Sequence, residues 1–357
     1  MCAMIWLHNM GVKVLLDMTY TPFVSVVIPC FNEEEFIAQC LDSIIANDYD
    51  KGNLEILVVD GLSTDHTRVI LQDYQRKHSF IKVIDNPAHH KPHALNLGIQ
   101  SARGAVIIRM DAHAIYRPDY ISKCIQYLEA YGADNVGGVR LTSPRNSTRI
   151  GRAIAQAISH PFAAGNATYR TGAREIKWVD TVFGGCYRRE VFDKIGLFNE
   201  ALIRGQDREF NVRLTEAGGR ILFAPDIVCE YFVRSNLKSY IPWTYVGGLT
   251  PFYISRITRK PIFSWRNLIP LCFVLVLAGI LLLSLFYSPF LWIFGGIVGI
   301  YLVASVIASF SVVRDERDGC FLILMPFIFA ITHITYGIGS LMGFFKPIRR
   351  QSEWSKV

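Results

Sequence analysis

The chain of 357 residues is long enough for about two domains, and its mean hydropathy of +0.26 is high for a soluble enzyme. The net charge of +7 is modest and no long run of Lys or Arg occurs, which argues against nucleic acid as a partner. Eight cysteines occur without a C-x-x-C pair, so the sequence indicates neither a zinc site of that spacing nor a disulfide framework.

The first 20 residues are predicted to form an extension with little structure. Their apolar run from Ile5 to Leu7 is too short for the core of a signal peptide. Met18 lies just before the first predicted strand, so the sequence leaves open whether Met1 or Met18 is the true start.

From residue 21 onward, short apolar runs alternate with helix-forming stretches. Strands are predicted at 24–28, 54–59, 81–84, 105–110 and 136–139, with helices between them. Such repeated strand–helix units predict an α/β domain with a Rossmann-like, mostly parallel sheet and helices on both faces.

Polar side chains follow the predicted strands, with Asn32 and Glu33 after the first, Asp60 after the second, and Asp111 and His113 after the fourth. Because parallel strands end at one edge of a sheet, we expect these groups to converge. An Asp and a His one residue apart are a plausible ligand pair for a divalent cation. The alternatives stay open that Asn32 and Asp111 cap helices and that His113 is only solvated.

Neither a G-x-G-x-x-G nor a P-loop motif is present, so a nucleotide site here would depend on carboxylates, a metal and a lysine. Five motifs follow one another along the chain: VVIPCFNE (26–33), VVDGLSTD (58–65), DAH (111–113), FGGCYRR (183–189) and GQD (205–207). In this order they resemble family 2 glycosyltransferases of the GT-A fold. The nearest likeness is to the succinoglycan-type exopolysaccharide glucosyltransferases.

The resemblance implies three sets of site residues. The nucleotide-sugar donor is expected on Pro29, Asn32, Glu33, Asp60, Lys91, Asp111 and Arg234. Mn²⁺ or Mg²⁺ is expected on Asp111 and His113, with the acceptor on Gly184, Gly185 and Gln206. Asp207 is the expected catalytic base, which takes a proton from the acceptor hydroxyl as that oxygen attacks the anomeric carbon.

Five positions depart from the pattern of the family or have a second interpretation. Gly61 replaces a second Asp, Gln206 replaces a Glu, and Tyr231 lies where some relatives carry a further metal-binding His. Asp207 would also serve as the N-cap of a helix over 208–217. Arg234 would equally suit a surface or lipid-facing position.

Three apolar stretches near the C-terminus, 268–287, 290–310 and 321–345, are each about long enough to span a bilayer. The expected organisation is an N-terminal extension (1–20), a GT-A domain (21–240), a juxtamembrane or interfacial segment (241–267), a transmembrane region of about three spans (268–345) and a basic tail (346–357). Basic residues on both flanks suit anionic membrane lipids.

The orientation expected for these stretches conflicts with the positions of the basic residues that flank them. If the GT-A domain is cytoplasmic, three crossings place Lys346, Arg349 and Arg350 outside, against the positive-inside rule. The sequence leaves open whether one stretch is re-entrant or interfacial instead.

The resulting prediction is an inverting, metal-dependent transferase in the bacterial inner membrane. It would move a sugar, glucose by the resemblance, from a UDP-sugar to a lipid-linked glycan in exopolysaccharide biosynthesis. Two other interpretations remain: a polyprenyl-phosphate sugar transferase, whose acceptor needs no base, and a non-catalytic, membrane-anchored binding or assembly subunit.

Overall fold

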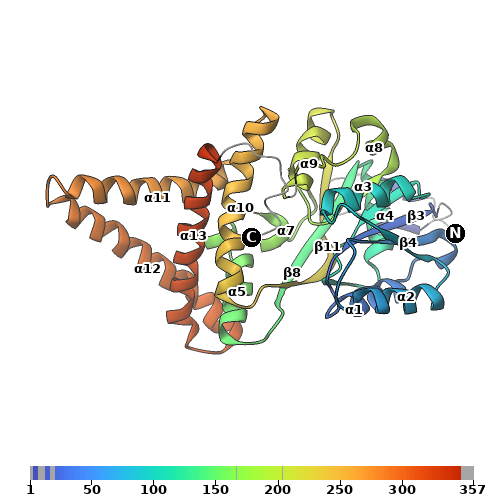
Figure 1. Cartoon of the computed structure of the whole chain (residues 1–357), viewed down its shortest axis with the longest axis horizontal. Coiled ribbons are helices and arrows are strands. Elements are labelled where there is room, and N and C mark those ends of the chain that lie inside the picture. The colour runs from blue at the N-terminus through green and yellow to red at the C-terminus, as the bar shows by residue number, and fades with distance from the viewer. Residues whose placement is uncertain (1–2, 7–12, 17–20, 166, 203, 347–357) are drawn as a thin grey trace. The chain divides into compact units, whose positions relative to one another are not determined.

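The computed structural model of the chain describes residues 3–6, 13–16, 21–165, 167–202 and 204–346 (Figure 1). The chain divides into two compact units, each made of two segments. The first unit comprises residues 1–140 and 172–231, and the second comprises 141–171 and 232–357. Each unit is described by itself below.

The first unit contains a sheet with strand order β5-β4-β3-β6-β10-β8-β11-β7, and β9 pairs with β11. Strands β3 (Val24–Cys30), β4 (Leu54–Asp60), β5 (Ile81–Asp85) and β6 (Val106–Arg109) run parallel. The remaining described strands are β7 (Ala114–Tyr116), β8 (Asn135–Pro144), β9 (Lys177–Trp178), β10 (Cys186–Arg188) and β11 (Ile221–Val233). The predicted parallel arrangement holds for the first four strands, whereas β10 pairs antiparallel with β6 and β8.

Helices cover both faces of this sheet, as predicted. Helices α1 (Ile37–Ile45), α2 (Thr67–Lys77) and α4 (Tyr120–Tyr131) contribute to one hydrophobic core. Helices α3 (Lys91–Ser101), α8 (Arg189–Ile195) and α9 (Gln206–Glu216) lie on the other face, and Figure 1 shows α3, α8 and α9 opposite α1 and α2. Both faces of β3 and β4 are therefore buried, which is why these strands are rich in Val, Ile and Leu.

Helix α3 packs unusually closely on the sheet at Gly98. A Cβ atom at this position would lie 2.3 Å from Val27 Cγ1 on β3 and 3.2 Å from Val59 Cγ2 on β4. The absence of a side chain at Gly98 thus lets α3 approach the two central strands, and it places Lys91, the first residue of α3, at the carboxyl edge of the sheet.

The expectation of little structure before residue 21 is wrong for part of that segment. Strand β1 (Ala3–Trp6) pairs antiparallel with β2 (Lys13–Leu16). Both are short apolar runs that extended pairing accommodates, although neither has the length of a signal-peptide core. The rest of the first 20 residues lies outside the described part of the chain.

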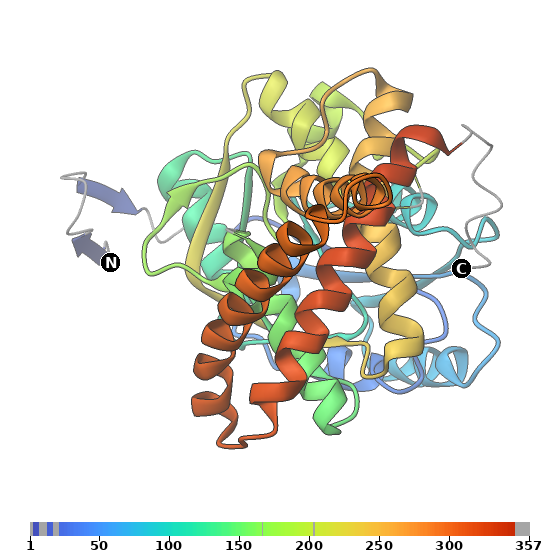
Figure 2. The same cartoon turned by 90° about the vertical axis from the view of Figure 1, so that its left-hand side faces the viewer.

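The second unit is helical. Its helices are α5 (Arg149–Ser159), α6 (Pro161–Ala164), α7 (Thr168–Thr171), α10 (Leu237–Thr258), α11 (Trp265–Ser284), α12 (Phe290–Glu316) and α13 (Phe321–Phe345). Within the described residues, α11, α12 and α13 are long and apolar enough to cross a membrane. Figure 2, which looks nearly along α11, shows α10 and α13 side by side.

Candidate active site

The loops that follow β3 and β4 are bound to each other through Asn32. The Asn32 backbone N–H donates to Ser63 Oγ at 2.9 Å, and the Thr64 N–H donates to Asn32 Oδ1 at 2.8 Å. Asn32 has a left-handed φ of 52°, which Asn tolerates better than most residues. The predicted helix cap is wrong, because the N-cap of α1 is Phe36 and Asn32 instead joins two loops at the sheet edge.

Asp60 ends β4 next to this junction, and its side chain is fully buried. The Ser63 hydroxyl donates to Asp60 Oδ1 at 2.5 Å, and Arg68 Nη1 lies 2.8 Å from Asp60 Oδ2. Arg68 also pairs with Asp85 at 2.9 Å, so the Asp60 carboxyl group is held in place by Arg68 and Ser63. Pro29, in the adjacent strand β3, is half-buried. Nucleotide binding by Asp60 and Pro29 stays a prediction.

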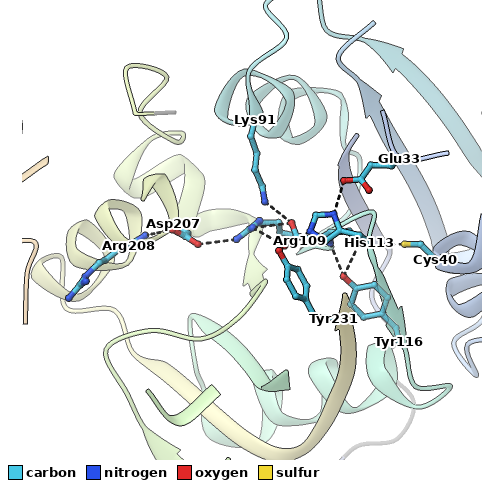
Figure 3. A network of polar contacts seen from close by, with 10 residues as sticks. Glu33, Cys40, Lys91, Arg109, His113, Tyr116, Asp207, Arg208 and Tyr231 are labelled. Carbon is cyan, nitrogen blue, oxygen red and sulfur yellow. Dashed lines mark hydrogen bonds and ion pairs between the residues drawn. The ribbon is translucent and has the colours of Figure 1, made fainter. Parts of the chain in front are cut away.

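A chain of four alternating charges crosses the end of β6 (Figure 3). Lys91 Nζ lies 2.7 Å from Asp111 Oδ1, and Arg109 Nη2 lies 3.1 Å from the same oxygen. The other end of the Arg109 guanidinium reaches Asp207, with Nη1 3.4 Å from Oδ2. Arg109 thus connects the predicted donor-binding carboxylate to the predicted base.

Burial and charge act in opposite directions on this network. Burial alone would raise the pKa of Asp111, but Arg109 and Lys91 hold it well below its usual range. Burial lowers the pKa of Lys91, and neighbouring Arg109 lowers it further. The result is an ionised Asp111 that is only 4% exposed, a state that a buried carboxylate reaches only with cations beside it.

His113 connects the loop after β3 to strand β11. Its Nδ1 lies 2.7 Å from Glu33 Oε1, and its Nε2 lies 2.8 Å from Tyr231 Oη. Because a carboxylate only accepts hydrogen bonds, His113 Nδ1 is the donor of the hydrogen bond to Glu33. Nε2 faces the Tyr231 hydroxyl, and a metal bound at Nε2 would take the place of that hydrogen bond.

The donor set at this position fits a divalent cation. Asp111 offers oxygen and His113 offers nitrogen, and Glu33 behind the imidazole is the outer partner that metal-binding histidines usually have. No group of three His, Cys, Asp or Glu side chains with metal-site geometry occurs in the described ranges of the chain. The residues present therefore suit a cation that takes its remaining ligands from phosphate oxygens.

The two glycines predicted on the acceptor side border this network. Gly184 and Gly185 have left-handed φ values of 70° and 110°, which favour glycine. A Cβ on Gly184 would lie 2.9 Å from the Arg109 carbonyl, and Gly185 accepts a hydrogen bond from the Arg109 N–H at 2.9 Å. This close approach positions the loop against the end of β6, and acceptor binding by the glycines stays a prediction.

Asp207 lies in the first turn of α9 rather than at its cap. The N-cap is Gly205, and Asp207 Oδ1 accepts a hydrogen bond from the N–H of Arg208 at 2.9 Å. The Asp207 side chain is 41% exposed, unlike Asp111. Because Gly205 is the N-cap, the N-cap interpretation of Asp207 is wrong. The residue before it, Gln206, is only 4% exposed, and its Oε1 atom has no hydrogen-bond partner among the described residues.

Arg234 and the other predicted site residues belong to different units, which are described separately. Arg234 belongs to the second unit, where its guanidinium lies 5.9 Å from the ring centroid of Trp243. A donor contact by Arg234 stays a prediction. Three of the charged candidates, Lys91, Asp111 and Asp207, gather around Arg109.

Two residues of the network were missed by the sequence argument, although both left a signal. Arg109 is the one charged residue in a buried apolar strand, and it lies two positions before Asp111. Residues two apart in a strand share a face, which would have placed the guanidinium beside the carboxylate. Tyr231 was noticed as a replacement for His, but its hydrogen bond to His113 links positions 118 residues apart.

Comparison with known sequences identifies the family of the chain. The profile of glycosyl transferase family 2 matches residues 25–196. The dolichyl N-acetyl-alpha-D-glucosaminyl phosphate 3-beta-D-2,3-diacetamido-2,3-dideoxy-beta-D-glucuronosyltransferase of Methanococcus voltae is 30% identical over 333 residues, which cover 91% of this chain and 98% of that protein. The succinoglycan biosynthesis protein ExoA of Rhizobium meliloti (strain 1021) is 27% identical over 259 residues, covering 72% and 77%.

Comparison with solved structures agrees with the fold. The mannosyltransferase PcManGT from Pyrobaculum calidifontis, solved in complex with GDP-mannose and Mn²⁺, superposes with a TM-score of 0.57. The match covers 93% of this chain and 89% of that one at 20% sequence identity. The predicted GT-A fold is therefore confirmed, together with apolar C-terminal helices.

Proposed function

We propose that this chain, which belongs to glycosyl transferase family 2 and is a transferase enzyme, moves a sugar from a UDP-sugar to a lipid-linked glycan. Transfer would invert the configuration at the anomeric carbon, because the acceptor oxygen displaces the diphosphate directly. The observation that carries this proposal is the Arg109 bridge, which brings two carboxylates with different surroundings to one site.

The two carboxylates suit different tasks. Asp111 is buried and permanently ionised, which suits the charged end of the donor. Asp207 is 41% exposed in the first turn of a helix, where an incoming hydroxyl group can reach it. In the proposed reaction, Asp207 accepts the hydroxyl proton while the acceptor oxygen bonds to the anomeric carbon. The bond between that carbon and the diphosphate breaks, and UDP leaves with its electron pair.

Asp111 and His113 would hold the divalent cation, with Glu33 keeping the proton on Nδ1 of His113. When bound, Mn²⁺ or Mg²⁺ supplies charge neutralisation to the departing diphosphate. Lys91 contributes a second positive charge from the start of α3, near the helix N-terminus that itself favours anions. Asn32 and Asp60 would form the nucleotide side of the pocket, since both are fixed at the same sheet edge.

Two observations support a lipid-linked acceptor. The Methanococcus voltae relative is named for a dolichyl-phosphate-linked sugar, and it aligns along nearly the whole of this chain. The second unit contains three helices of membrane-spanning length and composition. The likeness to the succinoglycan biosynthesis protein ExoA supports exopolysaccharide biosynthesis as the process, and glucose is the donor sugar that the resemblance of the motifs implies. We place the enzyme at the bacterial inner membrane with its first unit in the cytoplasm, where sugar nucleotides are made.

The full chain, purified in detergent, tests the proposal directly. Radiolabelled UDP-sugars are incubated with a lipid-linked glycan extract and with Mn²⁺, Mg²⁺ or EDTA. We expect label in the lipid-linked glycan with either metal and none with EDTA. Label on polyprenyl phosphate alone would instead identify a polyprenyl-phosphate sugar transferase. Neither transfer nor hydrolysis of any UDP-sugar would contradict the proposal and favour a non-catalytic subunit.

A further inference from the structure

The three apolar helices of the second unit have different surfaces. On α12, consecutive side chains are exposed, with Leu291 at 52%, Trp292 at 86% and Ile293 at 50%. Helix α11 is exposed along most of its length apart from buried Asn267 and Leu271 near its start, and its last leucines reach 47% or more. Helix α13 differs, because one face is buried and most of its exposed apolar residues form a stripe at positions 323, 327, 334, 338, 342 and 345, with Phe344 exposed beside it. Such one-sided exposure is typical of a helix lying at an interface.

Chain connectivity fixes the membrane side of α5. Residues 145–148 separate β8 from α5, and four extended residues span at most about 14 Å. The hydrocarbon core of a bilayer is about 30 Å thick. The segment 141–171 also returns to the first unit at residue 172. Helices α5, α6 and α7 therefore stay on the side of the first unit.

Helix α5 in turn fixes the end of α12. Arg149 Nε lies 2.9 Å from Asp318 Oδ2, and Arg152 Nη1 lies 2.8 Å from Glu316 Oε2. Gln156 Nε2 donates to the other oxygen of Glu316 at 2.7 Å. Three side chains of one short helix thus hold the segment between α12 and α13. That segment must lie on the same side of the membrane as α5.

Between β11 and the segment that joins α12 to α13, the chain therefore crosses the membrane an even number of times. Helix α10 follows β11 after three residues, carries Lys238 and Arg256, and contains two prolines. It is not one of the helices with membrane-spanning composition, whereas α11 and α12 both are. With 1.5 Å per residue, the 20 residues of α11 reach about 30 Å and match the hydrocarbon core. If α11 and α12 each cross the membrane once, the number of crossings is two, which is even as required.

Helix α13 is held at its start, middle and end by segments on the side of the first unit. The Arg152 guanidinium lies 5.2 Å from the ring centroid of Phe321. His333 Nε2 lies 3.0 Å from the Phe162 carbonyl oxygen in α6, so it donates to that acceptor. Arg256, near the end of α10, donates to the carbonyl oxygen of Lys346 at 2.8 Å. A helix with both ends on one side has not crossed.

Close backbone packing keeps α13 on α10. A Cβ on Gly248 of α10 would lie 2.0 Å from the Tyr336 carbonyl oxygen, and one on Gly339 of α13 would lie 2.0 Å from the Tyr245 carbonyl oxygen. Ser340 Oγ donates to the Gly248 carbonyl at 3.3 Å. These contacts are incompatible with a freely placed third span, because α13 cannot move into the bilayer without α10.

We propose that the α11–α12 hairpin alone crosses the bilayer, while α13 lies at the membrane surface on the side of the first unit. The C-terminal tail is then on that same side, and the turn at Ser288–Pro289 is on the opposite side. This arrangement removes the conflict with the positive-inside rule. The basic residues before α11 and in its first turn, together with Lys346 after α13, would then lie on the side of the first unit, near one layer of anionic headgroups: Arg256, Arg259, Lys260, Arg266 and Lys346.

Single-cysteine labelling of the full chain tests this topology. Cys2, Cys272 and Cys320 are replaced by serine, and S79C, S288C or S352C is added to that background. A fourth variant keeps native Cys320, which is exposed. A membrane-impermeant maleimide is applied to intact spheroplasts and to inverted vesicles. Ser79 is exposed in the first unit and reports the side on which that unit lies.

We expect S288C to be labelled in spheroplasts, and S79C, Cys320 and S352C to be labelled only in inverted vesicles. Labelling of S352C in spheroplasts would mean that α13 crosses the membrane. Labelling of S288C only in inverted vesicles would mean that the α11–α12 hairpin does not cross it. Either result overturns the proposal. Reporters fused after Val357 give an independent measurement, in which green fluorescent protein should fluoresce and alkaline phosphatase should stay inactive. Active phosphatase would overturn the proposal as well.

Discussion

The two units use charge in opposite ways. The first unit has 21 Lys and Arg against 26 Asp and Glu, a formal net charge of −5. The second has 16 Lys and Arg against four Asp and Glu, a net of +12. In the first unit, charged side chains reach the interior, as Arg109 and Asp111 do at 5% and 4% exposure. In the second, large apolar side chains occupy the surface instead.

This difference fits what each unit binds in the proposed function. A cation and a diphosphate require fixed charges of both signs, and a buried carboxylate stays ionised only when a cation compensates it. A bilayer with anionic headgroups favours apolar groups in its core and cations at its surface. Accordingly, two of the few carboxylates of the second unit, Glu316 and Asp318, serve as partners for arginines of α5.

The largest effect is expected from D207N in the first unit. The amide keeps the shape of the side chain but cannot accept the acceptor's proton. Turnover should therefore fall by about 10²–10⁴-fold, while donor affinity changes little because Asp111 and His113 remain. Turnover and UDP affinity are measured on the same purified protein. D193N, which changes an exposed carboxylate on α8, is the matched control and should retain full activity.

If the turnover rate of D207N were within about threefold of the wild-type rate, the loss would be far smaller than that expected from removing a general base. That result would leave Asp207 with only its contacts to Arg109 and Arg208, as a structural residue. The polyprenyl-phosphate acceptor would then be favoured, because a phosphate needs no base.

A smaller effect is expected from E33Q, which tests whether the carboxylate that contacts His113 Nδ1 supports metal binding by His113. Loss of the negative charge behind His113 should weaken Mn²⁺ binding by about 10–100-fold, the usual effect of removing an outer-shell partner. The measurements are the dependence of rate on Mn²⁺ concentration and direct Mn²⁺ binding by electron paramagnetic resonance. E34Q changes the neighbouring carboxylate, which pairs with exposed His66, and should leave Mn²⁺ binding unchanged. Equal affinities in both variants and the wild type would remove Glu33 and His113 from the metal site.

The sequence predicted the strand-end residues better than the contacts among them. Asp60, Asp111 and His113 follow apolar strands, so periodicity alone placed them at one edge of the sheet. The bonds of His113 to Glu33 and Tyr231 could not be predicted in that way, because they join positions 80 and 118 residues apart. The antiparallel half of the sheet was missed for a related reason, since β10 is a three-residue strand whose partners are distant in sequence.

Apolar length also failed to separate α13 from α11 and α12. All three helices are longer than 18 residues and contain an 18-residue window of membrane-spanning hydropathy, and only the packing of α13 on α5, α6 and α10 distinguishes it. The relevant signal is the glycine and serine content of α13, which a length criterion ignores. Gly337, Gly339, Ser340 and Gly343 lie on the buried face, where backbones approach closely.

A pair of Gly→Ala changes compares packing in the two units. In G98A, the new Cβ meets Val27 at 2.3 Å, and overpacking of this kind costs about 1–3 kcal/mol. In G279A on α11, no atom lies within 4 Å of the new Cβ, and alanine gains up to about 1 kcal/mol of helix propensity. Thermal unfolding in detergent should therefore show a lower Tm for G98A and an unchanged or higher Tm for G279A. A lowered Tm for G279A would show that α11 is covered rather than exposed to lipid.

The smallest effect is expected from R149Q in the second unit. The Arg149 side chain is 62% exposed, and exposed ion pairs contribute little because solvent screens them. Arg152 and Gln156 still hold Glu316, so the labelling pattern of Cys320 should not change. Labelling of Cys320 from the opposite side in R149Q would show that a single ion pair sets the topology. That result would contradict the view that Arg149, Arg152 and Gln156 together hold the segment between α12 and α13.

The pH dependence of this small effect has a definite sign. The pKa of Asp318 is lowered from its ordinary 3.8, first by the hydrogen bond from the Cys320 backbone and then by Arg149. A lowered pKa means that the contribution of this carboxylate is complete above about pH 4 and is lost as the pH falls through the folded-state value. The Tm difference between R149Q and the wild type should accordingly be small at pH 7 and become smaller still as the pH falls below about 4. A difference that grows on acidification would show that Arg149 acts through something other than Asp318.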